Sequence, residues 1–272
     1  MERTTVDGLE LEYDLRGEGE PVVLIHWGVG TAWAEPLLAE PALEGRYRLL
    51  SYHRAGYAGS GSVDGQVSMA LHAEHCRLLM RQLGIERAHI VGHSSSAVVA
   101  LQLALDSPDV VHTIVSMEAA RPAPQTEVQA EFRRNVAERA VELYRAGDTS
   151  GAVDTWCKGV FGPDYRAPLD RTLPGAFDQT VAEADAFFPL ELPALMEWQF
   201  TEADASRITQ PVLLVLGEKS VATFPERRDL LLAWLPNAEP VDVPGATHLL
   251  HLERPRETAE AVVSFLARHP LT

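Results

Sequence analysis

The feature that most constrains this fold is a strand-to-helix turn around Ser94. An apolar run ends in the small residues Gly-His-Ser-Ser-Ser at positions 92–96, and a second apolar run, residues 97–101, begins directly behind it. This arrangement matches the nucleophile elbow G-x-S-x-G except at its last position, where Ser96 replaces glycine. Residues beside the serine must be small because the apex is strained and its backbone passes close to the helix. The pattern predicts a nucleophilic serine at position 94.

The rest of the chain alternates apolar runs with amphipathic stretches, except over residues 121–208. The predicted strands cover residues 9–15, 21–26, 47–52, 88–93, 111–117, 211–217 and 239–243. Helical spacing marks residues 67–83, 95–105, 227–235 and 256–269. Alternating strands and helices predict an α/β fold with a mostly parallel sheet and helices on both faces.

Residues 121–208 contain amphipathic helical stretches, for example 128–144 and 150–161, and no strand pattern. A helical block inserted between two strands lies over the C-terminal edge of such a sheet, where these folds bind ligands. We therefore predict a core formed by residues 1–120 and 209–272, with residues 121–208 inserted as a helical cap.

Charge and cysteine content exclude several classes of protein. The chain of 272 residues has 23 Lys and Arg against 39 Asp and Glu, a formal net charge of −16. Such a surface repels phosphate backbones, so we expect neither nucleic acid nor a membrane as partner. Cys76 and Cys157 are too few for a disulfide framework or a zinc site, and free thiols suit a reducing compartment. The N-terminus has no apolar signal core and no run is long enough to span a bilayer, so we expect a cytoplasmic protein.

A serine hydroxyl needs a base that removes its proton and an acid that orients the base. His248, which leaves a strand through Pro-Gly-Ala-Thr at residues 244–247, is the predicted base; the alternative is an ordinary surface-loop histidine. His251 lies three residues further on, but without an acidic or cysteine cluster the two histidines do not make a metal site.

Two glutamates compete for the role of the acid. The usual position is the loop after the strand that ends at Gly217, but Ser220 stands where an aspartate is expected and cannot carry the charge. Glu118 directly follows the strand after the elbow helix, so its carboxylate can lie beside the histidine loop. We favour Glu118 over Glu218; the alternative roles for Glu118 are a helix-start acid or an ion pair with Arg121.

The loop after the first buried strand, His-Trp-Gly-Val-Gly at residues 26–30, should provide the second oxyanion donor. Gly28 allows close approach of the backbone, so we pair its N–H with that of Ser95 as the oxyanion hole. These glycines could equally only close a turn. Trp27 either forms a wall of the pocket or belongs to the core, and the sequence favours neither.

Together these motifs resemble the α/β-hydrolase superfamily over nearly the whole chain. They are residues 26–30, Arg-Ala-Gly-Tyr-Ala-Gly-Ser at 54–60, the elbow at 92–96, and Gly-Ala-Thr-His at 245–248 followed by Glu-Arg-Pro at 253–255. A glutamate after the strand is similar to the acid of haloalkane dehalogenases, whose aspartate nucleophile is replaced here by Ser94. With a serine nucleophile, it also resembles the zearalenone-type lactonases, which have a helical cap. The resemblance implies a serine hydrolase acting on a carboxylic ester or lactone, without metal or organic cofactor.

Aromatic side chains of residues 121–208 predict a largely apolar pocket for a hydrophobic small molecule. They are Phe161, Tyr165, Phe177, Phe187, Phe188, Trp198 and Phe200. We expect Trp27 and Trp198 to contact the substrate; the alternative is that these aromatics form the cap's own core. The same triad of Ser94, His248 and Glu118 would also serve a thioesterase or a C–C bond hydrolase, and the same scaffold would also suit a ligand receptor of low turnover. Whether the chain forms a homodimer is left open.

Overall fold

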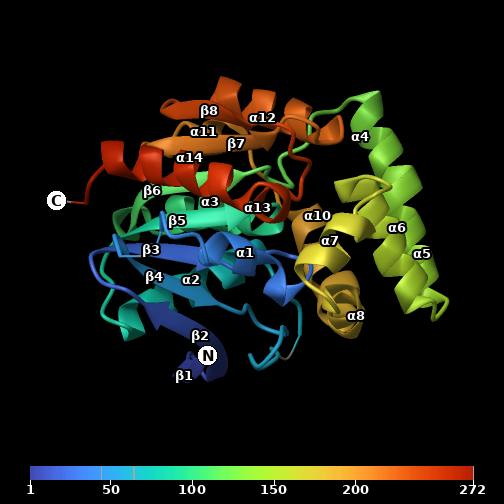
Figure 1. Ribbon diagram of the computed structural model, residues 1–272, viewed down its shortest axis with the longest axis horizontal. Coiled ribbons are helices and arrows are strands. Elements are labelled where there is room, and N and C mark those ends of the chain that lie inside the picture. Colours follow the sequence, from blue (N-terminus) through green and yellow to red (C-terminus); the bar gives the residue numbers. More distant parts are fainter. Residues whose placement is uncertain (44, 64, 272) are drawn as a thin grey trace.

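A computed structural model describes residues 1–43, 45–63 and 65–271, and its centre is a single eight-stranded sheet (Figure 1). The strands are β1 (Glu2–Val6), β2 (Leu9–Arg16), β3 (Glu20–Ile25), β4 (Tyr47–Tyr52), β5 (Ala88–His93), β6 (Val111–Met117), β7 (Val212–Gly217) and β8 (Ala238–Val243). Their spatial order is β1-β2-β4-β3-β5-β6-β7-β8. The pairs β1–β2 and β2–β4 are antiparallel, and all other neighbours are parallel. The predicted mostly parallel sheet is confirmed.

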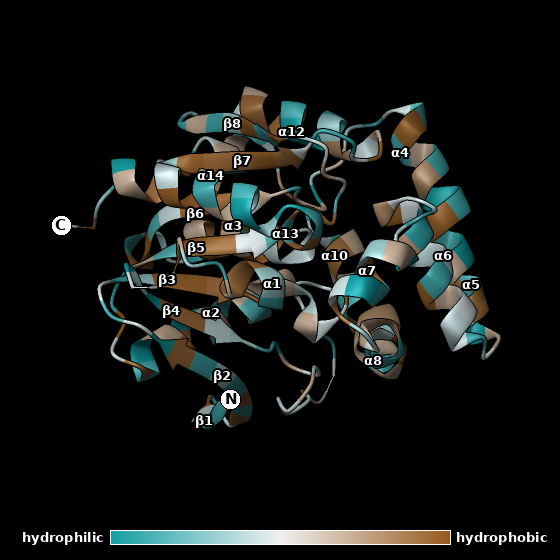
Figure 2. Ribbon diagram, viewed as in Figure 1, coloured by the Kyte–Doolittle hydropathy of each residue, from teal (hydrophilic) through white to brown (hydrophobic). Residues whose placement is uncertain are grey.

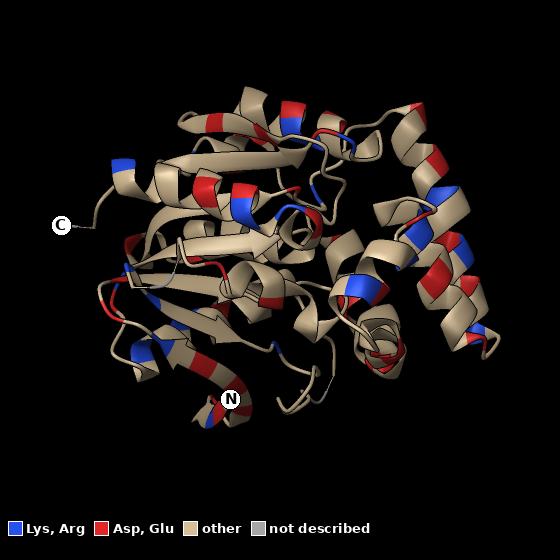
Figure 3. Cartoon of the chain, viewed as in Figure 1, with Lys and Arg blue, Asp and Glu red and all other residues tan. Residues whose placement is uncertain are grey.

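Side chains of the central strands alternate between two buried clusters, one on each face of the sheet. In β3, Val22 and Leu24 belong to one cluster, whereas Val23 and Ile25 belong to the other. A strand buried on both faces needs an uninterrupted apolar sequence, which explains the runs seen in β3, β5 and β7 (Figure 2). Neither β5 nor β7 has a charged residue, and the charges lie mainly on helices, loops and outer strands (Figure 3).

Helices cover both faces of the sheet, as the alternating pattern predicts. The first cluster joins the sheet to α1 (Glu35–Leu38), α13 (Leu250–Glu253) and α14 (Pro255–Arg268). The second joins it to α2 (Met69–Gln82) and α3 (Ser95–Asp106), and α12 (Thr223–Trp234) contributes to both. The sequence pattern did not predict β1, because four of its five residues are exposed or only partly buried and show little apolar periodicity.

Between β6 and β7 the chain forms helices only, and we call residues 121–208 the cap. Its elements are α4 (Glu127–Phe132), η3 (Arg133–Glu138), α5 (Arg139–Arg145), α6 (Thr149–Phe161), α7 (Arg166–Thr172), α8 (Ala176–Ala182), α9 (Ala184–Ala186), η4 (Phe187–Glu191), α10 (Leu192–Glu197) and α11 (Glu202–Ala205). Most of them gather at one end of the sheet (Figure 1). Within the described residues, no helix combines the length and the apolar character needed to cross a membrane.

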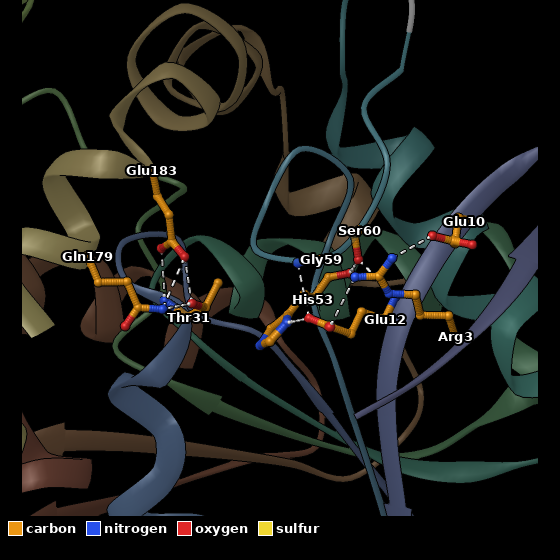
Figure 4. A network of polar contacts seen from close by, with 9 residues as sticks. All are labelled: Arg3, Glu10, Glu12, Thr31, His53, Gly59, Ser60, Gln179 and Glu183. Carbon is orange, nitrogen blue, oxygen red and sulfur yellow. Dashed lines mark hydrogen bonds and ion pairs between the residues drawn. The ribbon is translucent and has the colours of Figure 1, made fainter.

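Polar contacts of two cap glutamates, Glu183 and Glu191, help to attach the cap to the core. Glu183 accepts hydrogen bonds from the backbone N–H (3.1 Å) and hydroxyl (2.6 Å) of Thr31, beside Gln179 of α8 (Figure 4). The second contact is fully buried: Glu191 of η4 forms an ion pair with Arg54 (2.9 Å) and accepts from the hydroxyl of Tyr57 (2.6 Å). A separate network in the core fixes the loop after β4, because Glu12 accepts from His53 and Gly59 (Figure 4).

Candidate active site

Ser94 occupies the apex of the turn between β5 and α3. Its φ of 56° and ψ of −116° lie outside the favoured regions, a strain of the kind that concentrates at active sites. Two backbone hydrogen bonds hold the apex: Ser94 N–H donates to the carbonyl of Met117 (2.9 Å), and Ala120 N–H donates to the carbonyl of Ser94 (3.1 Å). The strand–turn–helix geometry is therefore the one that the sequence predicts.

The small residues of this turn have identifiable reasons. A Cβ on Gly92 would overlap the backbone of Ser96, so only glycine fits there. The departure at position 96 is accommodated because the Ser96 hydroxyl accepts from the His93 N–H (2.8 Å) and donates to the His93 carbonyl (2.9 Å). Ser96 thus closes the turn with its own side chain, and the elbow keeps its shape without the second glycine.

Glu118 and His248 lie in direct contact, although 130 residues separate them. A carboxylate oxygen of Glu118, Oε2, forms a short, buried ion pair or hydrogen bond with Nδ1 of His248. The other oxygen accepts from the Gly217 N–H (2.5 Å) and from the Ser220 hydroxyl (2.5 Å). Ser220, which stands where an acid was expected, therefore supports Glu118 instead.

The competing acid, Glu218, points elsewhere. Its carboxylate accepts from the Gly245 N–H (2.7 Å), and within the described chain it makes no hydrogen bond to His248. Nor does Glu118 pair with Arg121. Of the two glutamates weighed from the sequence, the structure brings Glu118 to the histidine.

Burial shifts the pKa values of Glu118 and His248 in opposite directions. It raises the pKa of Glu118, against the hydrogen bonds from Ser220 and Gly217, which lower it. It lowers the pKa of His248 well below 6.5, and the positive charge of Arg227 lowers that pKa further. The imidazole is therefore held neutral, with the proton of Nδ1 facing Glu118. Its Nε2 is buried without a hydrogen-bond partner in the described residues, so it is free to accept a proton.

Aromatic rings fix the plane of the His248 imidazole. Phe224 of α12 stacks on it with 3.9 Å between ring centroids, and Phe161 of the cap lies 5.4 Å away. His93 donates from Nε2 to the backbone carbonyl of His248 (3.0 Å). His251 packs against His93 and Trp27 at 4.7 and 5.5 Å. The histidines therefore form a packed aromatic group around the candidate base.

Ser94 and His248 line the same small cavity, together with the two predicted oxyanion donors. A Cβ on Gly28 would overlap the Ser95 hydroxyl and lie 2.7 Å from Glu191, so glycine is needed there. The N–H of Ser95, the first residue of α3, belongs to the donors that a helix start leaves unpaired. Trp27 lies in the buried core and also lines this cavity, so both of its expected roles are compatible with its position.

A second, larger cavity of about 660 Å³ lies between core and cap and is also lined by Ser94. Its lining includes Arg121, Arg227, Gln129, Trp156, Val160 and Leu195. The wall of this cavity is mixed, because guanidinium and amide groups share it with aromatic and aliphatic ones, whereas the small cavity is lined mainly by apolar side chains. The expectation of a largely apolar pocket therefore stays a prediction.

Trp198 lies away from both cavities that Ser94 lines. Its indole N–H donates to Gln102 of α3 (2.7 Å), and its ring stacks on Phe200 at 5.0 Å. The predicted substrate contact at Trp198 is corrected, because this ring packs between the end of the cap and α3. Of the other cap aromatics, Phe161 and Phe187 line the small cavity.

Sequence reasoning missed Arg121 and Arg227, two of the arginines that line the large cavity, as candidate site residues. The sequence presents Arg121 only as an ion-pair partner for Glu118, and Arg227 lies in a helix whose sequence is that of an ordinary surface helix. The contact that marks Arg227 joins it to Gln129, 98 residues away. The only local signal was a basic residue three positions after the predicted acid.

Comparisons with known proteins agree with this geometry. Residues 22–261 match the model of the alpha/beta hydrolase family. A protein of Caulobacter vibrioides named "Putative carbamate hydrolase RutD" is 29% identical over 96% of both chains. A protein of the same name from Klebsiella pneumoniae is 37% identical over 98 residues, which span 36% of this chain and only 37% of that protein. The crystal structure of an enol-lactonase from Burkholderia xenovorans LB400 superimposes with a TM-score of 0.76 at 22% identity, covering 98% of this chain and all of that one.

Proposed function

The chain belongs to the alpha/beta hydrolase family, and on that premise we propose that it hydrolyses a carboxylic ester or lactone through an acyl-enzyme on Ser94. The observation that carries the proposal is the contact of Glu118 with Nδ1 of His248, at a cavity that Ser94 also lines. An imidazole can act as a base when it is neutral. One ring nitrogen is then held by a carboxylate, and the other is free to accept a proton.

In the proposed reaction, Nε2 of His248 takes the proton of Ser94 as the hydroxyl oxygen attacks the carbonyl carbon. The N–H groups of Gly28 and Ser95 stabilise the negative charge that forms on the carbonyl oxygen. The imidazolium, stabilised by Glu118, then protonates the departing alkoxide, and the acyl group remains on Ser94. A water molecule, activated by the same nitrogen, releases the acid and restores the serine.

Carbamate hydrolysis is a second candidate, because the relatives from Caulobacter vibrioides and Klebsiella pneumoniae are both named "Putative carbamate hydrolase RutD". They align with 96% and 36% of this chain. Ser94 would attack the carbonyl carbon of the carbamate in the same way. The leaving group would then be an amine or ammonia instead of an alkoxide. The rates for a matched aryl ester and aryl carbamate distinguish the two reactions.

The test is a panel of lactones, aryl esters and aryl carbamates assayed with wild type and Ser94→Ala in parallel. Removal of the hydroxyl should lower kcat/KM at least about 10³-fold, since only oxyanion stabilisation and binding remain. A fluorophosphonate probe should label wild type and not the variant. Equal turnover by both proteins would refute the proposal, as would substrate binding without any turnover, which would indicate a receptor.

A further inference from the structure

The large cavity between core and cap has positive charges that the described chain leaves without counter-ions. Arg121 and Arg227 both line it, as does Ser94. Neither guanidinium forms an ion pair with any described carboxylate. Arg54 is the contrasting case: it is buried like Arg227, but Glu191 neutralises it at 2.9 Å.

Arg227 is only 6% exposed, yet its hydrogen-bond partner is uncharged. Its Nε and Nη2 donate to the side-chain oxygen of Gln129 (3.1 and 2.9 Å). The rings of Phe132 and Phe224 lie 5.3 and 5.2 Å from its guanidinium carbon. Its Nη1 donates to no described group. Burial lowers its pKa, and the nearby charge of Arg121 lowers it further.

The carboxylates of Glu118 and Glu226 raise the pKa of Arg227, but both accept hydrogen bonds from other groups. Glu118 is held by His248, Gly217 and Ser220. Glu226 accepts from the Thr126 hydroxyl (2.6 Å) and from the amide of Gln129 (3.1 Å). A buried cation is costly unless an anion pairs with it, so this site is incomplete without one.

Arg121 adds a second cation close to the candidate nucleophile. It follows Ala120, whose N–H donates to the carbonyl of Ser94. Its Nε is buried and has no hydrogen-bond partner in the described residues. Burial lowers its pKa.

We propose that the substrate carries a carboxylate, which Arg121 and Arg227 bind while its ester or lactone carbonyl lies at Ser94. Guanidinium groups match the two oxygens of a carboxylate with paired hydrogen bonds. Trp156, Val160 and Leu195 line the same cavity and suit the short apolar chain that joins the two ends. The substrate class is thus an ester or lactone of an acid with a second, free carboxylate. This inference rests on the proposed function.

Two esters with the same five-carbon acyl chain test the proposal: 4-nitrophenyl pentanoate and the mono-4-nitrophenyl ester of glutaric acid. They differ only in the terminal carboxylate. Wild type should prefer the acidic ester by at least about tenfold in kcat/KM, mainly through KM. Arg121→Gln and Arg227→Gln should each lower this preference by about tenfold, and Arg121→Lys should restore part of it.

Arg133→Gln is the matched control. Arg133 lines the same cavity, but it is exposed and pairs with Glu138 at 3.6 Å, so this variant should keep the wild-type preference. Circular dichroism shows whether Arg227→Gln folds. If it does not, Arg121→Gln still tests the proposal, because Arg121 is only partly buried and its replacement should disturb folding less. A wild-type enzyme without preference for the acidic ester overturns the proposal, as does a preference that survives both substitutions.

Binding separates this inference from the proposed function. Calorimetry with the Ser94→Ala protein should detect monomethyl glutarate but not methyl pentanoate, and Arg121→Gln introduced into it should abolish that binding. This result supports the carboxylate site even if neither nitrophenyl ester is hydrolysed. Turnover of the neutral ester that depends on Ser94, without anion binding, supports the proposed function and refutes the inference. Binding of inorganic phosphate but not of monomethyl glutarate also refutes it, in favour of a phosphorylated ligand.

Discussion

The two sides of Ser94 are built differently. On the core side, the carboxylate of Glu118 contacts three groups of the chain itself, from His248, Gly217 and Ser220. On the side that faces the cap, the buried Nε of Arg121 has no hydrogen-bond partner among the described residues, and Arg227 of α12 bonds there only to the neutral Gln129. Among the described residues, Nε2 of His248 has no hydrogen-bond partner, and neither Arg121 nor Arg227 has an anion paired with it.

This difference separates reactivity from selectivity. Groups that activate a nucleophile must be positioned before the substrate arrives, so the chain supplies their partners. Groups that select a substrate gain most when the ligand supplies the missing partner. Four predictions, ordered by decreasing size, test or sharpen this division.

The largest effect should come from Glu118. Glu118→Gln keeps the shape of the side chain but removes the charge that stabilises protonated His248, so kcat should fall by about 10³–10⁴-fold. Glu218→Gln is the matched control and should stay within about threefold of wild type, since its carboxylate contacts Gly245. Steady-state kinetics with an aryl ester measures both; the reverse ranking would move the acid to the loop after β7.

The next effect concerns the buried tie between cap and core. Glu191→Gln leaves the charge of Arg54 buried and unpaired, which should lower the free energy of unfolding by about 3–5 kcal/mol. Glu183→Gln removes the less buried tie to Thr31 and should lower it by only about 1 kcal/mol. Urea denaturation of the two variants measures the difference, and equal losses would show that the buried ion pair has no special role.

Gly28→Ala tests the oxyanion donors on the core side. An added Cβ would displace Ser95 or Glu191 and should lower kcat by about 10²-fold with little change in KM. Thermal unfolding of the variant should be measured alongside, to separate a lost donor from a general loss of stability. A variant with unchanged kcat would remove Gly28 from the proposed oxyanion hole.

The smallest effect is on the pH dependence of activity, because the charge of Arg227 acts on the pKa of His248. His248 must be neutral to act as a base, and burial together with the charge of Arg227 lowers its pKa well below 6.5. Activity should therefore survive as pH falls past 6.5, and kcat/KM at pH 6.5 should exceed half of its plateau. Arg227→Gln should move the acid limb toward higher pH. A wild-type midpoint at or above 6.5 would contradict the assignment, because burial and the charge of Arg227 both oppose protonation of His248.

Much of the fold and part of the candidate site follow from local sequence. The runs of β3, β5 and β7 predict buried parallel strands because such strands must be apolar on both faces. The turn at Ser94 is also local: Gly92 avoids the backbone of Ser96, and the Ser96 side chain bonds to its neighbour His93. The same is true of cap helices such as α6, whose spacing predicts them.

Only the tertiary structure shows that Glu118, and not Glu218, contacts His248, because both glutamates follow apolar strands and the sequence does not reveal which carboxylate faces the histidine loop. It also moved Trp198 from the pocket to a contact with Gln102, and it placed Arg121 and Arg227 on one cavity. The physical reason is the range of the interactions. Backbone conformation and periodic burial are set by residues near in sequence, whereas the pairing of a buried charge depends on groups that packing brings together from distant segments.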